Sequence, residues 1–436
     1  MRRWKLLALI GIFVSFWSAA ASADIFYSAT DGSASSFGTI SGASYTVRKD
    51  LYTLPLGYPT VASFSDLGGK EWVVVENYNW QDSVSSTVDI FDLKDWTKPA
   101  GGEYTDWGTN IKGLAVVGDC LYIASFERRE AGEEKSGEVI RVDLSGQGSP
   151  DKPFEPDGTV YKFSPLEDIL RRPAAMEVVG GKIYVLTYTY DGVHTIDAGM
   201  GASELFEFDE NLELLRSAVI GGGDSGKNTQ YMASYGGKLY LGSTGGAQGA
   251  SSIGAVWEVN PGGTDLEATK IVDLGDIPDL DATARSVYGV SIADDGTALL
   301  IVGGYDSEND WSFSSRLYVA TASALSAGEY GEPISIPEGT YVESVKYDAK
   351  LDVFWCGMSG AGYGNLEARG KSGAILKTIT ANELGNNIGT FAIIGETPKY
   401  EPSVDSASSG GGCNAGIGAF AFLLLAFSAL LKIREK

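Results

Sequence analysis

The chain has 436 residues, with 57 acidic side chains, 33 basic side chains and a net charge of −24. This length suffices for one large all-β domain or for two or three ordinary domains. A surface this acidic repels phosphate backbones, so nucleic acid is excluded as an expected partner. The acidity is explained either by solubility or by attraction of divalent and basic ligands.

The first residues have the pattern of a cleavable secretory signal peptide. Basic residues at the start are followed by an apolar stretch, 6–17, and then by the A-x-A cleavage site Ala21-Ser22-Ala23. We therefore expect residues 1–23 to be removed and the mature chain to begin at Asp24. The pair Arg2-Arg3 also occurs in twin-arginine signals, but the rest of that motif is missing.

A repeated supersecondary unit follows the signal. V-V-G-D-C-L-Y-I-A-S-F begins at Val116, and V-V-G-G-K-I-Y-V-L-T-Y begins at Val178. Each copy predicts an apolar strand, a tight turn of the kind that needs φ > 0, and a second strand with alternating aliphatic and aromatic residues. These turns are 50 to 62 residues apart and lie at Gly69, Asp119, Gly181, Gly237, Gly296 and Lys350.

A third strand is expected after each copy. It opens with a small residue, alternates with period two, and often ends in Asp or Asn, where a turn begins. A period of this length with about four strands is typical of a β-propeller blade. The third strands are expected to begin at Ser86, Gly137, Ser203, Gly254, Ser315 and Gly373.

The two ends of the repeat region complete one more unit. Ile25–Thr30 and Phe37–Ser41 match second and third strands, and Gly389–Gly395 matches a first strand without partners. We therefore predict an all-β, seven-bladed β-propeller over residues 24–398, with its last blade closed by strands from both termini. The alternative, two β-sandwiches, requires a central linker, and residues 200–230 contain only an inter-blade loop.

Two local features accompany this fold. Ser164–Arg172 is expected to form a short helical turn, because a serine cap precedes a proline. Cys120 and Cys356 lie in strand-like stretches far apart in the sequence. We expect free buried thiols, and a disulfide between them is the alternative.

Candidate binding residues cluster in the loops between second and third strands. These loops should share one face of the propeller with the inter-blade loops, opposite the tight turns. Aromatic rings beside amides and carboxylates suit glycan or peptide recognition, although the same rings would also pack the loops together. The candidates are Tyr78, Asn79, Trp80, Tyr188, Tyr190, Asp191, Tyr305, Asp306, Asp310 and Trp311.

One acidic stretch is a candidate calcium site. Ca²⁺ prefers six to eight oxygen ligands from flexible loops. The stretch lacks EF-hand spacing, and a solvated acidic turn is the alternative. Its four carboxylates belong to Asp273, Asp276, Asp279 and Asp281.

The sequence offers little for catalysis. The single histidine, His194, excludes a zinc site with several histidines, and a Ser-His-Asp site would have to include it. No G-x-S-x-G motif lies in a strand–turn–helix context. A hydrolase or lyase with a pair of carboxylates needs only two acids at the right separation, and it stays open.

After residue 398 the sequence changes to a Ser/Gly-rich linker, 399–412, and then to an apolar run, 415–431. As a helix this run would be about 26 Å long at about 1.5 Å per residue, close to the roughly 30 Å hydrocarbon core of a bilayer. Basic residues at the very end fit a cytoplasmic terminus. We expect residues 413–436 to form a transmembrane segment with the propeller outside.

This tail resembles the Synergist-type C-terminal sorting signals, which are related in layout to the GlyGly-type tails of rhomboid-like sorting protease substrates. The resemblance rests on S-S-G-G-G-C-N-A-G, the apolar run and the basic end, and covers under a tenth of the chain. It implies membrane insertion, cleavage by a sorting protease near Gly411, Gly412 and Cys413, and retention on the cell envelope. By analogy with cysteine-containing relatives, Cys413 is implied as a site of lipid attachment.

Three hypotheses for function follow. The first is an envelope-anchored, non-enzymatic propeller that presents its loops to glycans, peptides or a surface protein. The second is a secreted hydrolase or lyase with Asp or Glu on the same face. The third is a self-associating component of a surface layer.

Overall fold

The structure, a computed structural model, describes residues 23–400 except for a set of short gaps. The gaps are 32–33, 43, 55–58, 78–86, 100–102, 131–132, 146–152, 191–200, 222, 246–252, 278–279, 281–284, 307–311, 335, 338, 361–362 and 396–398. All described residues belong to the first of two compact units, 1–401 and 402–436.

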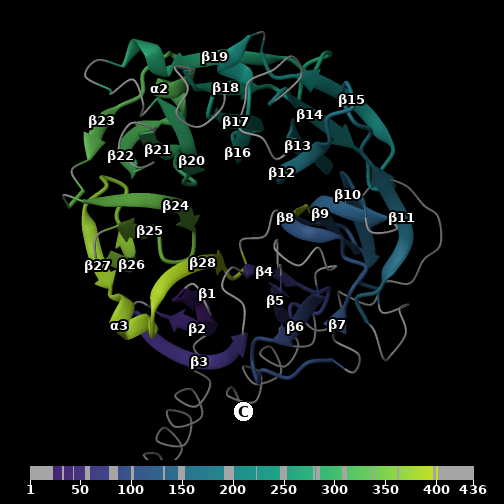
Figure 1. Cartoon of the computed structure of the whole chain (residues 1–436), viewed down its shortest axis with the longest axis vertical. Coiled ribbons are helices and arrows are strands. Elements are labelled where there is room, and N and C mark those ends of the chain that lie inside the picture. Colours follow the sequence, from purple (N-terminus) through teal and green to yellow (C-terminus); the bar gives the residue numbers. More distant parts are fainter. Residues whose placement is uncertain are drawn as a thin grey trace, which may run out of the picture. The chain divides into compact units, whose positions relative to one another are not determined.

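Seven antiparallel sheets surround a central axis (Figure 1). Blade 1 contains β4 (Thr60–Ser65), β5 (Glu71–Asn77), β6 (Thr87–Asp92) and β7 (Glu103–Tyr104). Blade 2 contains β8 (Thr109–Val117), β9 (Cys120–Glu130), β10 (Glu133–Asp143) and β11 (Pro156–Lys162). Blade 3 contains β12 (Arg171–Val179), β13 (Lys182–Thr189), β14 (Ser203–Phe208) and β15 (Leu214–Val219).

The remaining blades have the same order, with the innermost strand first. Blade 4 contains β16 (Thr229–Tyr235), β17 (Lys238–Ser243), β18 (Ala255–Val259) and β19 (Ala268–Asp273). Blade 5 contains β20 (Ser286–Ile292), β21 (Thr297–Asp306), β22 (Ser312–Thr321) and β23 (Glu332–Ile334). Blade 6 contains β24 (Thr340–Asp348), β25 (Val353–Gly360), β26 (Tyr363–Arg369) and β27 (Ile375–Ile379).

The closing blade is built from both ends of the described chain, as predicted. Its order is β28 (Asn387–Ile393), β1 (Ala23–Thr30), β2 (Ser35–Ser41) and β3 (Thr46–Leu54). Ile25 of β1 pairs with Ile393 of β28. Seven closed blades confirm the propeller and exclude two sandwiches.

One further strand extends the pairing beyond the predicted end of the propeller. β29 (Lys399–Tyr400) lies parallel to β8 and pairs with Val116 and Val117. Since β8 ends there, Tyr400 lies at the face of the tight turns.

Two local expectations were wrong. The third strand of blade 6 is β26, and the stretch after Gly373 forms the fourth strand, β27. The charged residues Glu367 and Arg369 interrupt the alternating apolar pattern by which β26 would be recognised in the sequence. In the structure both side chains are buried and form an ion pair of 2.6 Å. Residues 164–170 form no helix, because Glu167 and Asp168 have φ of 50° and 66° and close a tight turn.

Two blades build the first turn on an aspartate. Asp66 accepts hydrogen bonds from backbone N–H groups of the turn through Oδ1 and from the Trp72 indole, at 2.9 Å, through Oδ2. Asp348 does the same in blade 6, with Trp355 at 3.2 Å. These are the two turns whose sequences match the repeat least well, and an aspartate side chain adds hydrogen bonds to each of them.

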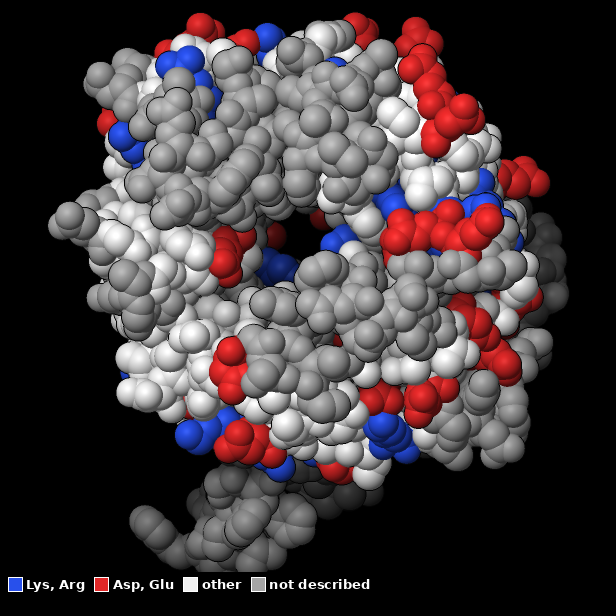
Figure 2. Space-filling view, viewed as in Figure 1, with Lys and Arg blue, Asp and Glu red and all other residues white. Residues whose placement is uncertain are grey.

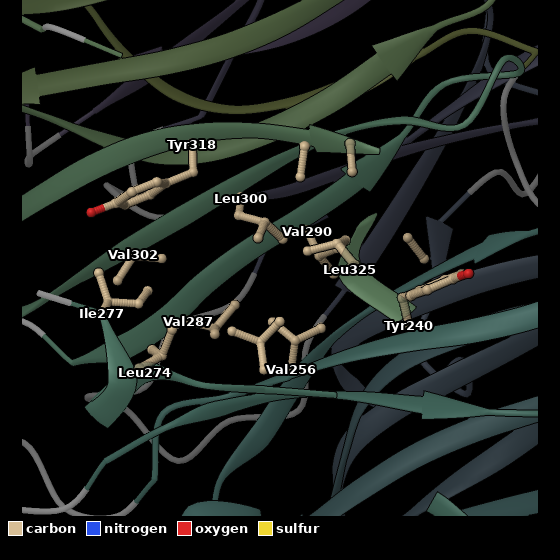
Figure 3. Close-up of a cluster of buried hydrophobic side chains, with 14 of the residues drawn as sticks. Tyr240, Val256, Leu274, Ile277, Val287, Val290, Leu300, Val302, Tyr318 and Leu325 are labelled. Carbon is tan, nitrogen blue, oxygen red and sulfur yellow. The ribbon is translucent and has the colours of Figure 1, made fainter. Parts of the chain in front are cut away.

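Apolar side chains fill the interfaces between neighbouring blades. Figure 3 shows the cluster between blades 4 and 5, where Tyr240 and Val256 face Leu300 and Tyr318. The short helix α2 (Ala322–Ser326) adds Leu325 to it. Burial of each large aliphatic side chain contributes about 1.5–3 kcal/mol, so the packing of blade against blade supplies most of the stability.

Serines at the start of third strands connect one blade to the next. Each hydroxyl accepts a hydrogen bond from a backbone N–H near the start of the following blade's first strand. This explains why a small polar residue recurs at that place in the repeat. The pairs are Ser136 with Arg171, Ser203 with Thr229 and Ser315 with Val342, at 2.9, 2.9 and 2.8 Å.

Replacement of one of these serines should destabilise the propeller. Ser203→Ala removes the acceptor of the fully buried Thr229 N–H, and an unsatisfied buried donor costs about 1–3 kcal/mol. Urea denaturation of the mature protein measures the loss. Ser217→Ala, on the exposed outer strand β15, is the matched control and should change stability by less than about 0.5 kcal/mol. Equal effects of the two variants would refute the connecting role.

Candidate functional site

Most of the predicted binding residues lie outside the described part of the chain. Those outside it are Tyr78, Asn79, Trp80, Asp191, Asp310 and Trp311, together with His194, Asp279, Asp281, Gly411, Gly412 and Cys413. Only the backbone of Tyr305 and Asp306 is described, at the end of β21, where they pair with Phe313 and Ser312. Tyr188 and Tyr190 are described in full.

The strand order fixes which face carries the loops. First and second strands are joined by tight turns at one face, so second and third strands are joined at the opposite face, here called the loop face. Figure 2 shows an opening along the axis, with charged side chains of both signs on its wall. Innermost strands line this channel.

Tyr188 and Tyr190 belong to a cluster of aromatic and basic side chains near the loop-face end of blades 2 and 3. Phe126 of β9 lies 6.2 Å from Tyr188 and 6.3 Å from Tyr190, and the two tyrosines are 6.3 Å apart, measured between ring centroids. The Lys112 amine lies 5.2 Å and the Arg172 guanidinium 4.8 Å from the Phe126 centroid. We call these five residues the mouth cluster.

Arg172 is a buried member of the mouth cluster and contacts both Phe126 and two carboxylates. It is 2% exposed and pairs with Glu127 at 2.9 Å and Glu134 at 3.0 Å, while its Nε is buried without a hydrogen-bond partner in the described structure. Removing one partner from such a buried pair strands a charge and is strongly destabilising. The base of the mouth cluster is therefore rigid.

Lys112 is the exposed charge of the cluster. It lies on the innermost strand β8, is exposed to solvent and forms no ion pair within the described residues. The side chain as a whole keeps solvent-accessible surface, but the surrounding channel wall desolvates its amine and lowers the pKa of that group. The charges of Glu76 and Glu127 oppose this shift. Glu76 accepts hydrogen bonds from the backbone N–H groups of Asn110 and, at 2.7 Å, Ile111, so its carboxylate is engaged.

The mouth cluster can stack against an apolar face and donate to an acceptor. Phe126 and Tyr190 are half-buried and keep accessible ring surface beside the Lys112 amine. Sequence reasoning found the two tyrosines and missed Phe126, Lys112 and Arg172. A basic residue in an otherwise apolar first strand was the available signal for Lys112.

Further charges lie on other innermost strands. Glu177 of β12 is half-buried and accepts a hydrogen bond from Ser234 at 3.1 Å, and burial raises its pKa to about 7. Lys346 of β24 donates to the Phe391 carbonyl at 2.9 Å, and burial lowers its pKa to about 8. Both pKa values are near neutrality because the channel wall desolvates the charged forms.

In the described half of the acidic stretch, Asp273 caps a short turn. Asp273 accepts hydrogen bonds from the Gly275 N–H at 2.9 Å and from Lys270 at 2.6 Å, as the cap of the 3₁₀ turn η2 (Leu274–Asp276). Asp276 is exposed. Across the described residues, no three His, Cys, Asp or Glu side chains are placed to hold a metal. The calcium hypothesis remains a prediction for the whole stretch.

The described cysteines are free, as predicted. Cys120 is half-buried, and Cys356 is fully buried. Burial raises the pKa of the Cys356 thiol to about 12, so it is unreactive at neutral pH. Within the part of the chain that the structure describes, no helix is long and apolar enough to cross a membrane.

Seven four-stranded blades around an open axis, the last one closed by β1 and β28 from the two ends of the described chain, define a seven-bladed β-propeller. Similar solved structures include a 6-phosphogluconolactonase-like protein from Bacteroides uniformis, with 13% identity, a TM-score of 0.54 and coverage of 85% of this chain and 99% of that one. A Lactobacillus plantarum protein has 14% identity, a TM-score of 0.53 and the same coverage. No family model and no curated protein matches the chain. At these identities the likeness shows the fold alone.

Glu177 should make stability depend on pH. Its folded pKa of about 7 lies above the value of about 4.3 for an unfolded Glu, so the folded state binds the proton more tightly. Relative to Glu177→Gln, the wild type should lose about 1–2 kcal/mol as pH rises from 4 through 7, discounted for partial exposure. Urea denaturation of both proteins at pH 4 and pH 8 measures this. An equal difference at both pH values would contradict it.

Proposed function

We propose that the chain is an exported β-propeller, held at the cell envelope, that binds an extracytoplasmic ligand on its loop face and is not an enzyme. The observation that carries the binding part is the mouth cluster, in which Phe126, Tyr188 and Lys112 lie on strands and Tyr190 directly follows the end of β13. A site on rigid strands loses little entropy when a ligand binds.

The chemistry of the cluster favours a ligand with both apolar and polar faces. A sugar ring or a peptide side chain would stack on Phe126 and Tyr190. The Lys112 amine would donate to a hydroxyl, carbonyl or carboxylate at the rim of that ligand. Glycans, peptides and loops of surface proteins all meet this description.

The envelope location is supported by the sequences of the two chain ends. The signal-like residues 1–23 and the sorting-like tail around Gly411, Gly412 and Cys413 favour export, cleavage by a sorting protease and attachment through the membrane or a lipid. Ala23 and Tyr400, the described ends, both lie at the face of the tight turns. Neither end of the described chain therefore lies at the loop face.

One observation favours the alternative, an Asp/Glu-dependent hydrolase or lyase. Burial raises the pKa of Glu343, on the innermost strand β24, as it does that of Glu177. A carboxyl group with a raised pKa can act as a general acid near neutral pH. A panel of glycosidase substrates beside the binding screen separates the two functions.

A glycan and peptide array probed with residues 24–405 tests the binding function. Tyr190→Ala should weaken binding of any ligand found about five- to tenfold, because one stacking contact is worth roughly 1–1.5 kcal/mol. Tyr235→Ala, at the turn-face end of β16, is the matched control and should leave affinity unchanged. Equal affinity of wild type and Tyr190→Ala would refute the site. Turnover lost on replacing one channel carboxylate would support the enzyme instead.

Intact-mass analysis of the protein purified from its own membrane tests the location. We expect a chain that begins at Asp24 and lacks the apolar run 415–431, with added mass near Cys413 if a lipid is attached. A chain that retains Ala415 to Lys436 would refute the sorting proposal and leave a plain transmembrane anchor.

A further inference from the structure

The innermost strands of six blades share one irregularity in their pairing with the second strand. In the closing blade, Gly389 and Thr390 of β28 lie opposite Ser28 alone. In each of the other five blades, the pairing skips one residue, which forms a β-bulge. Bulges remove a residue from the hydrogen-bonded ladder and redirect its side chain, often beside functional sites. The skipped residues are Lys112, Ala174, Gln230, Tyr288 and Glu343.

These five residues lie at one height in the channel. Lys112, Ala174, Gln230 and Glu343 each precede the end of their strand by five positions, and Tyr288 precedes the end of β20 by four. Every first strand ends at the tight-turn face, so equal offsets mean equal heights along the axis. We call this set the bulge ring.

Each bulge residue is more accessible than the residue before it. Lys112 is exposed while Ile111 is buried, and Glu343 is exposed while Val342 is buried. Since both lie on innermost strands, their side chains reach solvent through the channel, where Figure 2 shows charges of both signs.

The charges of the bulge ring are only partly compensated by groups of the fold. Other charged residues of the innermost strands are engaged, for example Arg171 with Glu204 at 2.6 Å and Asp348 with its turn. Lys112 and Glu343 form no ion pair within the described residues, although the charges of Glu76 and Glu127 act on Lys112 and a hydrogen bond links Glu343 to Ser359. Desolvation by the channel wall lowers the pKa of Lys112 and raises that of Glu343. Keeping either side chain charged there therefore costs free energy.

The strands that carry the two charges lie on opposite sides of the axis (Figure 1). Lys112 belongs to blade 2 and Glu343 to blade 6, with three blades between them on one side and two on the other (Figure 1). A ligand between them must present a negative group to one and a positive group to the other. On the longer arc, Gln230 carries an amide, Tyr288 a phenol and Ala174 a methyl group.

We propose that the bulge ring binds a short peptide with free ends, whose carboxylate pairs with Lys112 and whose ammonium pairs with Glu343. The Gln230 amide and the Tyr288 hydroxyl would hydrogen-bond the peptide groups between these ends. This inference goes beyond the proposed loop-face function and shares only Lys112 with it.

Calorimetry on the mature protein tests the proposal, with triglycine and N-acetyl-triglycine amide as probes. Triglycine should bind, and blocking both ends should weaken binding at least tenfold because both charge pairs are lost. Lys112→Gln and Glu343→Gln should each weaken triglycine binding at least tenfold. The exchange variant, Lys112→Glu with Glu343→Lys, should restore binding to within about threefold, because the peptide can bind reversed.

The matched control is Lys346→Gln, on the same strand as Glu343 but about 10 Å nearer the turn face at about 3.3 Å per residue. It should change affinity less than threefold. Thermal melting verifies that each variant is folded. No binding of triglycine, equal binding of the blocked peptide, or equal loss with Lys346→Gln would overturn the bulge ring as the site. Loss with Tyr190→Ala but not with Glu343→Gln would place the peptide on the loop face and overturn it also.

Discussion

The pairing of β28 with β1 is the constraint on which the rest of the molecule depends. Side chains reinforce this ladder, because Tyr27 donates to the Leu384 carbonyl and Ser28 accepts from the Thr390 N–H. Without it, blades 1 and 6 would each expose an apolar face and β1 and β28 their free edges, which invite aggregation. The entropic cost of joining such distant segments grows only logarithmically with their separation, so one ladder can close the ring.

Closure also determines what the axis contains. Seven wedge-shaped sheets bring their innermost strands together. Apart from the two-residue pairing of β8 with β29, each of these strands has a ladder on one side only within the described residues. A bulge there costs the fold little, since the skipped residue has no further strand to pair with and faces the channel instead. The bulge position can therefore carry Lys, Ala, Gln, Tyr or Glu in different blades while the core between the blades stays apolar. Fold and channel chemistry are thus separable.

The blades could be predicted from the sequence because each tight turn is specified by a few adjacent residues. Gly180 and Gly181, for example, have φ of 57° and 76°, which glycine adopts without strain. The strand β26 was missed because Glu367 and Arg369 neutralise each other in a buried pair, which no period-two apolar pattern reveals. The mouth cluster was found only through Tyr188 and Tyr190, since its other members come from three other strands. The bulge ring was beyond prediction, because a bulge exists only relative to the partner strand and its members meet only after closure.

Charged side chains are in different electrostatic environments on the acidic surface and in the channel. Outside, a net charge of −24 keeps the protein soluble and needs no partners, since water screens each carboxylate. Inside, the wall excludes most water, so an unpaired charge is costly and a nearby opposite charge is worth more. Lys112 and Glu343 are opposite in sign but stay apart on opposite walls, because the rigid strands cannot bring them together. A ligand that reaches both side chains can supply the favourable electrostatic interactions that Lys112 and Glu343 do not make with each other. The fold therefore favours a small molecule that carries two separated charges.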